Sequence, residues 1–386
     1  MSSSNFDRNR RKLLVGAAGA SVLGILASAL PWQDFSMSNS KQSRYLRGGF
    51  FHRPVGYRPG AVYQASSATQ MFAFEWDFAS GESRLVEATL PIHIVDTHHI
   101  DRNLSILTSQ KTNRMALIDW SVGREVKAIE LADAGYFYGH ALYSDDGTKI
   151  LVPIFQGPGT SGFAIFEFPS LKQIDFIATS RGAAHQAIPL GGDTFFFGTT
   201  SDASKPNAFG ILNLSSRSVR YIETGFGNSP KKTVVAHMKD CGDHVIANLQ
   251  EPGNNGYLTN GALISFDKKT ETTRAVIGRG VLDFNTDMLS IDFDPTSGYA
   301  WITVPYQNRI EVWNVARGSL VKTLHFPIEV QPTAISRLED RDLVVVTTGH
   351  RFFAYNAKSI VRISTAEEKM PHHLLNGGHC AHTSRA

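Results

Sequence analysis

The segment that decides the fold spans residues 137–147 and reads FYGHALYSDDG, and it is followed by TKILVPIF at residues 148–155. Two apolar strands joined by a turn at Asp145, Asp146 and Gly147 predict a β-hairpin. Related segments recur along the chain. They begin at His98, His140, His185, His237, Ser290 and Thr333, at spacings of 42, 45, 52, 53 and 43 residues. Repeats of this length, built from short strands, are typical of propeller blades.

The repeat predicts an all-β protein, a seven-bladed β-propeller with four-stranded antiparallel blades. Each repeat contains short runs rich in Val, Ile, Phe and Tyr that are separated by Gly, Asp and Asn, and no amphipathic helix is evident. An upstream unit with strands near residues 71–76 and 83–87 brings the count to seven, and six or eight blades are also compatible. The alternative folds are a β-sandwich array and a β-helix. The sandwich array lacks this repeat spacing, and the coils of a β-helix are shorter than these repeats. The predicted propeller spans residues 46–366.

The N-terminus has the pattern of an export signal. Arg10 and Arg11 precede an apolar run, residues 13–30, which is rich in Gly and Ala and contains a small-residue cleavage site. Adjacent arginines before such a run match the twin-arginine (Tat) pattern. Residues 1–29 are therefore predicted to be a Tat signal, residues 30–45 a polar tether, and the mature protein periplasmic and off the membrane. The alternative is an uncleaved membrane anchor, because the run is barely long enough to span a bilayer.

The charge of the chain is concentrated in this signal. The 386 residues carry a formal net charge of +3, and residues 1–29 alone carry +3, so the mature chain is neutral. A neutral chain offers no electrostatic footprint for nucleic acid. The hydrophobic content of 42% excludes intrinsic disorder. Two cysteines, Cys241 and Cys380, exclude a disulfide framework and a four-thiolate metal site, although the periplasm would allow these two to pair.

Histidine is the residue type that points to a functional site. Four successive repeats begin with a histidine, namely His98, His140, His185 and His237. Because the first strand of each propeller blade lines the central channel, these imidazoles are expected to converge on the axis and to form a metal site for Cu, Zn or Fe. His99 and Gln186 are secondary candidates. The alternative is that each histidine only hydrogen-bonds to a neighbouring blade.

A second histidine-rich tract lies near the C-terminus. It contains His372, His373, His379, Cys380 and His382. This density of imidazole and thiol groups is typical of a metal-binding tract. Because residues 367–386 lack an apolar period, we expect a flexible tail outside the propeller, which either binds or delivers metal or has no role.

Motifs for catalysis are not found in the sequence. No G-x-S-x-G elbow, P-loop or strand-linked G-x-G-x-x-G is present. No nucleophile or general acid–base pair emerges either, so the pattern argues against an enzyme and leaves its status open. The aspartates at turns, such as Asp145 and Asp146, are interpreted as turn formers.

The FYGHALYSDDG segment and the steps that end in His185 and His237 resemble a family of exported bacterial propellers, domain of unknown function 1513, within the YVTN and quinoprotein-amine-dehydrogenase-like propellers. The resemblance covers residues 60–360. It implies a Tat-exported periplasmic protein encoded beside imelysin-like and dihaem-peroxidase-like proteins of iron uptake, and it implies no activity. The chain departs from the family pattern at residues 97–99, at Ala236, and at Gln186 in place of a glutamate. Loss of that carboxylate makes iron less favoured than a metal bound by neutral imidazole.

Three functions follow as hypotheses. The first is a periplasmic propeller that binds a transition metal, or a metal-bearing partner, at a histidine-lined channel mouth, with proteins of iron or other metal uptake as partners. The second is a non-catalytic protein-interaction scaffold, whose binding face would carry the insertions at residues 201–207 and 251–260. The third, and least favoured, is a metal-dependent oxidoreductase or hydrolase.

Overall fold

The computed structural model describes residues 43–51, 71–77, 80, 82–110, 112–132, 135–156, 160–200, 208–224, 234–252, 258–277, 288–327, 332–338, 342–348, 352–363 and 377–385. The predicted signal with Arg10 and Arg11, the insertion at residues 201–207, and His372 and His373 lie outside these residues. Within them, no helix has the length and apolar character that crossing a membrane requires.

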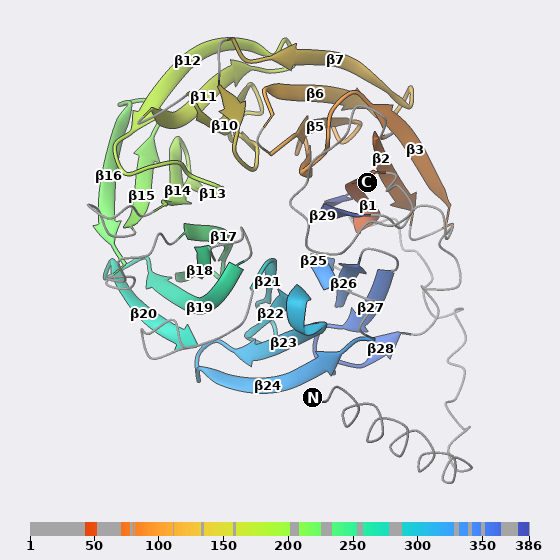
Figure 1. The fold of residues 1–386 in the computed structure, drawn as a ribbon, viewed down its shortest axis with the longest axis vertical. Coiled ribbons are helices and arrows are strands. Elements are labelled where there is room, and N and C mark those ends of the chain that lie inside the picture. The colour runs from red at the N-terminus through yellow and green to blue at the C-terminus, as the bar shows by residue number, and fades with distance from the viewer. Residues whose placement is uncertain are drawn as a thin grey trace, which may run out of the picture. The chain divides into compact units, whose positions relative to one another are not determined.

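The described strands form seven antiparallel sheets, which Figure 1 shows round a ring. Blade I contains β1 (Ser43–Phe51), β2 (Met71–Asp77), β3 (Ser83–Ala88) and β29 (Gly377–Arg385). Blade II contains β4 (Ile94–Thr97), β5 (Leu104–Thr108), β6 (Arg114–Asp119) and β7 (Arg124–Glu130). Blade III contains β8 (Tyr136–Phe137), β9 (Leu142–Tyr143), β10 (Lys149–Phe155), β11 (Ser161–Glu167) and β12 (Lys172–Thr179).

The remaining four blades follow in chain order. Blade IV contains β13 (Ala187–Gly191), β14 (Thr194–Gly198), β15 (Ala208–Asn213) and β16 (Ser218–Glu223). Blade V contains β17 (Val234–Asp240), β18 (His244–Pro252), β19 (Leu258–Asp267) and β20 (Thr272–Ile277). Blade VI contains β21 (Ile291–Asp294), β22 (Tyr299–Val304), the 3-10 helix η2 (Pro305–Gln307), β23 (Arg309–Asn314) and β24 (Ser319–His325). Blade VII contains β25 (Pro332–Leu338), β26 (Leu343–Thr348), β27 (Phe352–Asn356) and β28 (Arg362–Ile363). The predicted seven-bladed propeller of four-stranded antiparallel blades is confirmed, and in blade III the innermost strand is divided into β8 and β9, which both pair with β10.

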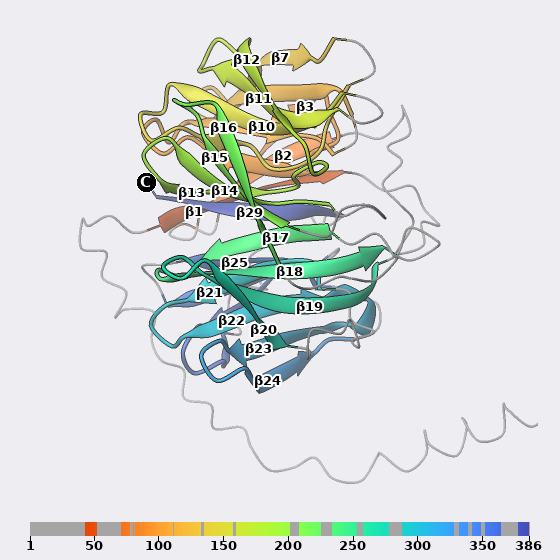
Figure 2. The ribbon, with the colours of Figure 1, turned by 90° about the vertical axis from the view of Figure 1, so that its left-hand side faces the viewer.

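Each blade has an inner strand that faces the centre of the ring and an outer strand at the rim. In Figure 1 the strands β13, β17, β21 and β25 lie nearest the centre, and β16, β20 and β24 lie at the rim. Figure 2 shows blade V from outside, with β17 to β20 following one another. The outer strands β7 and β24 contain only exposed and half-buried residues, because only one of their faces packs.

The middle strands are apolar on both faces because each blade is packed between two others. In β10, Ile150 and Val152 pack against blade II, whereas Leu151 packs against blade IV. In β14, Phe196 packs against blade V, and its neighbours Phe195 and Phe197 pack against blade III. Successive side chains of a strand point to opposite faces, so one strand supplies the core of two interfaces. This explains the continuous apolar runs that the sequence shows.

The C-terminal strand closes the ring, which corrects the expectation of a flexible tail for residues 377–385. The strand β29 pairs with β1 in antiparallel register and lies beside β4 and β25. It therefore occupies the inner position of blade I, and the propeller extends from Ser43 to Arg385 instead of over residues 46–366. The backbone pairing with β1 identifies the segment as a strand although its sequence has no apolar period.

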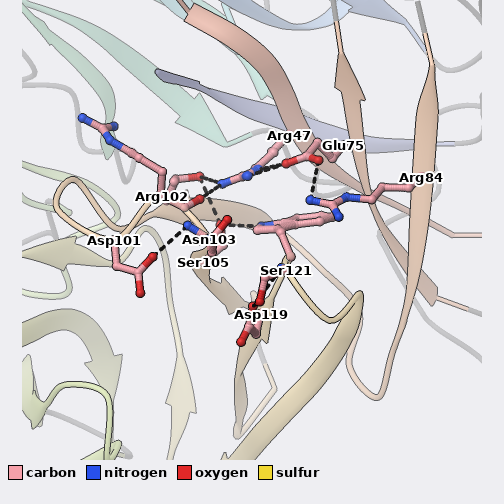
Figure 3. A network of polar contacts seen from close by, with 11 residues as sticks. Arg47, Glu75, Arg84, Asp101, Arg102, Asn103, Ser105, Asp119 and Ser121 are labelled. Atoms are coloured by element: carbon pink, nitrogen blue, oxygen red, sulfur yellow. Dashed lines mark hydrogen bonds and ion pairs between the residues drawn. The ribbon is translucent and has the colours of Figure 1, made fainter. Parts of the chain in front are cut away.

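A buried ionic network joins blade I to blade II (Figure 3). The guanidinium of Arg47 in β1 pairs with the carboxylate of Glu75 and also donates to the carbonyl oxygen of Arg102 at 2.6 Å. Glu75 accepts a second ion pair from Arg84, and Arg47 lies 4.8 Å from the ring centre of Trp120. Burial lowers the pKa of Arg47, and the neighbouring carboxylate opposes that shift. The network holds the inner edges of the first two blades together.

Side chains on the inner strands also connect successive blades. Asp96 Oδ2 accepts a hydrogen bond from the backbone N–H of Ala141 at 3.1 Å, which joins blades II and III. Asp292 Oδ2 accepts from the N–H of Arg337 at 2.7 Å, which joins blades VI and VII. These bonds fix the spacing of the inner strands, and with it the positions of residues that face the channel.

Candidate metal centre

Four buried histidines from four successive blades are packed together at the inner strands. His93, His140, His185 and His237 belong to blades II, III, IV and V, and they are 5–8% exposed. The ring centres are 5.4 Å apart for His93 and His140, 5.2 Å for His93 and His185, and 5.3 Å for His140 and His185. His237 lies 5.2 Å from His140 and 5.0 Å from His185. Of the four histidines predicted to converge, His140, His185 and His237 lie in this cluster and His98 does not.

The blade II member is His93, which the sequence analysis did not select. His93 directly precedes β4, and its N–H donates to the carbonyl oxygen of Thr108 at 2.7 Å. His98 follows the same strand and lies at its other end. The signal that identifies His93 is its position before the apolar pair Ile94 and Val95, just as His140 precedes Ala141 and Leu142 in the deciding segment.

Irregular strand pairing brings two of these histidines into the cluster. His140 lies between β8 and β9, where pairing with β10 is interrupted beside Pro153. Proline has no N–H to donate, so a neighbouring strand cannot pair regularly there. His237 lies where the register of β17 and β18 shifts between Val235 and Met238. Such bulges redirect side chains and are common beside functional sites.

Glycine at position 139 allows blades III and IV to approach closely. A Cβ on Gly139 would lie 1.6 Å from the carbonyl oxygen of His185, so no side chain fits there. The contact lets the N–H of His140 donate to that same oxygen at 3.0 Å. The G-H step of the sequence is therefore a packing requirement that holds His140 against His185.

The tautomer of His185 is set by a hydrogen bond to blade III. Its Nδ1 lies 2.9 Å from the carbonyl oxygen of Tyr138. Because a carbonyl oxygen only accepts, Nδ1 carries the hydrogen and the lone pair of the neutral ring is on Nε2. Ligating histidines almost always donate their second N–H to such an acceptor, which fixes the tautomer and the ring orientation.

The nitrogen atoms of three histidines are close enough to share one ion. One ligand atom from each of His93, His140 and His185 lies within 4.8 Å of the others, and all three residues are buried. A tetrahedral metal with bonds of about 2.0–2.1 Å holds its nitrogen ligands about 3.3 Å apart. Binding would therefore draw the three rings together by a short movement.

His98 is a structural residue, so its selection as a ligand was wrong. Its Nδ1 accepts a hydrogen bond from the N–H of Asp101 at 2.8 Å, and its Nε2 donates to the carbonyl oxygen of Gly147 at 3.1 Å. The ring stacks on Phe168 with the centres 4.4 Å apart. Both nitrogens are engaged, and burial lowers its pKa below the usual 6.5. His98 thus joins blade II to blade III, as the alternative interpretation expected.

The two secondary candidates beside the repeat starts are also engaged in blade contacts. His99 Nε2 lies 2.9 Å from the carbonyl oxygen of Asp145 and the residue is exposed. Gln186 Oε1 accepts a hydrogen bond from the N–H of Met238 at 2.6 Å, which joins blades IV and V. The turn role of Asp146 is confirmed, because hydrogen bonds from Ser144 and Thr148 lower the pKa of its carboxyl to about 2.

The C-terminal candidates are placed only by their backbone. His379, Cys380 and His382 are residues of β29, the inner strand of blade I, where Cys380 pairs with Gly48 and His382 with Arg47. Their side chains lie outside the described part of the chain.

Cys241 is a free thiol whose pKa is raised to about 12 by burial.

Comparison with known proteins supports the fold. No family model matches the chain, and no curated protein matches it. Among solved structures, it is similar to Kuenenia stuttgartiensis hydrazine synthase, with 14% identity, a TM-score of 0.57, and coverage of 81% of this chain and 100% of that chain. It is also similar to the β-propeller domain of Myceliophthora thermophila Cps50 (Swd1), with 12% identity, a TM-score of 0.52, and coverage of 72% and 90%. These likenesses define the class as a β-propeller and carry no function across.

Proposed function

We propose that this protein binds a transition metal ion through His93, His140 and His185 at the channel of the propeller. The observation that carries the proposal is the approach of three buried imidazoles to within 4.8 Å of one another. The group contains nitrogen donors and no carboxylate. Such a donor set suits Zn, Cu or Fe, whereas Mg and Ca prefer oxygen ligands. Zn and Cu are favoured over Fe, because Gln186 stands in place of a carboxylate and is engaged elsewhere.

The proposal includes export and a place in metal handling. The Tat-like signal at Arg10 and Arg11 and the FYGHALYSDDG motif support a periplasmic protein related to domain of unknown function 1513. The proposed role is acquisition of a transition metal, in contact with periplasmic uptake proteins or a metal-bearing partner. Replacing Arg10 and Arg11 by lysine should leave the protein in the cytoplasm, as cell fractionation would show. Unchanged export would refute the Tat route.

Metal analysis of the exported protein tests the site. Wild-type protein should retain about one equivalent of Zn or Cu, as one three-histidine site requires. The double variant His140→Ala plus His185→Ala should retain less than a tenth of that amount. His325→Ala changes an exposed histidine at the end of β24 and serves as the matched control. Metal-free wild-type protein with no affinity for added Zn, Cu or Fe would refute the site and favour the interaction scaffold.

A further inference from the structure

The three proposed ligands come from one side of the ring. His93, His140 and His185 belong to the adjacent blades II, III and IV. A metal bound by these three residues would have at least one further coordination position. Metal sites with three protein ligands commonly hold water or another exogenous ligand at this fourth position.

His237 lies next to this site and outside the ligand set. Its ring packs against His140 and His185, whereas within the described residues no ring contact joins it to His93. It also does not belong to the group whose nitrogens lie within 4.8 Å of one another. It comes from blade V, the first blade beyond the three that supply the ligands.

The backbone of His237 is held firmly in place. Its N–H donates to Asn248 Oδ1 at 2.6 Å, and Asn248 Nδ2 donates in turn to the carbonyl oxygen of Met288 at 2.7 Å. The residue lies in the register shift of β17, and it is only 8% exposed. A buried imidazole fixed beside a metal site can hydrogen-bond whatever occupies the position next to it.

Further round the ring, blade VI presents a different residue type. The repeat start there is Ser290, whose Oγ accepts a hydrogen bond from the N–H of Ile335 at 3.3 Å. That hydroxyl joins blades VI and VII. Among the side chains that the structure describes outside the ligand group, His237 is the imidazole that packs against two of the three proposed ligands.

We infer that the bound metal keeps one coordination position for a small exogenous ligand, such as water or a monodentate anion, and that His237 is the positioning residue that hydrogen-bonds this ligand. The inference rests on the proposed function, because it requires a metal held by His93, His140 and His185. The low exposure of the four histidines means that such a ligand would be shielded from bulk solvent.

Azide titration of the Co(II)-loaded protein tests the inference. Co(II) adopts the same nitrogen sites as Zn and has a visible spectrum that changes when its fourth ligand changes. Azide should shift the spectrum of the wild-type protein with a stoichiometry of about one. His237→Ala should keep Co(II) affinity within about threefold and weaken azide binding about tenfold, the loss of one hydrogen bond to an anion. His237→Gln, which keeps a donor, should restore part of the azide affinity, and His325→Ala should match the wild type.

Each remaining outcome overturns a defined statement. Loss of Co(II) affinity by a hundredfold or more in both folded His237 variants would make His237 a fourth ligand and refute the inference. Wild-type protein that binds Co(II) with four nitrogen ligands and takes up no azide would also refute it, while leaving the proposed function intact. Wild-type protein that binds no Co(II), Zn or Cu would refute both.

Discussion

His93 and His98 lie at opposite ends of the same short strand, β4, yet they serve different regions of the molecule. His93 packs against His140 and His185 in the axial cluster. His98 lies in the joint between blades II and III, with both ring nitrogens hydrogen-bonded to backbone atoms and its ring on Phe168. A histidine at the expected position of the repeat is therefore not necessarily a metal ligand. The hydrogen bonds of the two nitrogens decide whether an imidazole can bind a metal.

The largest expected effect comes from replacing His93 and His98 separately and measuring Zn binding. His93→Ala should weaken Zn binding by about a hundredfold, because it removes one of three ligands. His98→Ala should leave the dissociation constant within about threefold, because neither of its nitrogens is available. Isothermal titration with Zn measures both. Equal losses of Zn affinity in the two variants would contradict the assignment of His93 to the metal site and of His98 to the contact between blades II and III.

The second test acts on the cluster without touching a histidine. Gly139→Ala would place a Cβ against the carbonyl oxygen of His185 and push blades III and IV apart. We expect a loss of about 3 kcal/mol in the free energy of unfolding, together with weaker Zn binding. Denaturant unfolding and titration measure these effects. The control is Gly135→Ala, whose added Cβ would find its nearest neighbour at 3.4 Å. If both glycine variants behaved alike, close approach at Gly139 would not be what holds the cluster.

The third test concerns the contact that His98 makes between blades II and III. His98→Ala should lower the free energy of unfolding by about 2 kcal/mol, through the loss of two hydrogen bonds and of the ring packed on Phe168. His99→Ala, at an exposed neighbour, should cost less than about 0.5 kcal/mol. Urea denaturation of the metal-free proteins measures both values. If the free energy of unfolding of His98→Ala equalled that of the wild type, His98 would have no structural role.

The smallest expected effect is on pH dependence. Burial lowers the pKa of His98 in the folded state below its ordinary value of 6.5, so at mildly acid pH the unfolded chain binds the proton more tightly. The stability contribution of His98 is therefore complete above about pH 6.5 and declines as the pH falls through its folded pKa. His98→Gln should flatten the stability profile of the metal-free protein between about pH 5 and 7. An unchanged slope would assign the acid sensitivity to other groups.

The fold was predictable from the sequence, whereas the candidate ligand set was only partly so. The recurring hairpins and their spacing give the propeller, because strand cores packed between two blades must be apolar on both faces. Three of the four histidines in the cluster, His140, His185 and His237, follow from the same alignment. His93 was missed because blade II carries three histidines near one short strand, and the spacing alone does not show which end of the strand faces the axis.

The role of the C-terminal strand could not be predicted from the local sequence pattern. Gly377–Arg385 has no apolar period, and its role as the inner strand of blade I depends on pairing with β1, more than three hundred residues earlier in the chain. Backbone pairing of this kind needs no particular side chains. Sequence periodicity therefore cannot reveal it.

The class of fold, the blade count within one, and the residue type of the candidate site all follow from the sequence. They do so because packing between blades imposes a regular apolar pattern on every repeat. The tertiary structure decided which histidines meet, which nitrogen of His185 carries its hydrogen, and how the ring closes. These depend on a strand interrupted beside Pro153, a bulge at His237 and a close contact at Gly139, and the spacing of the repeats shows none of them.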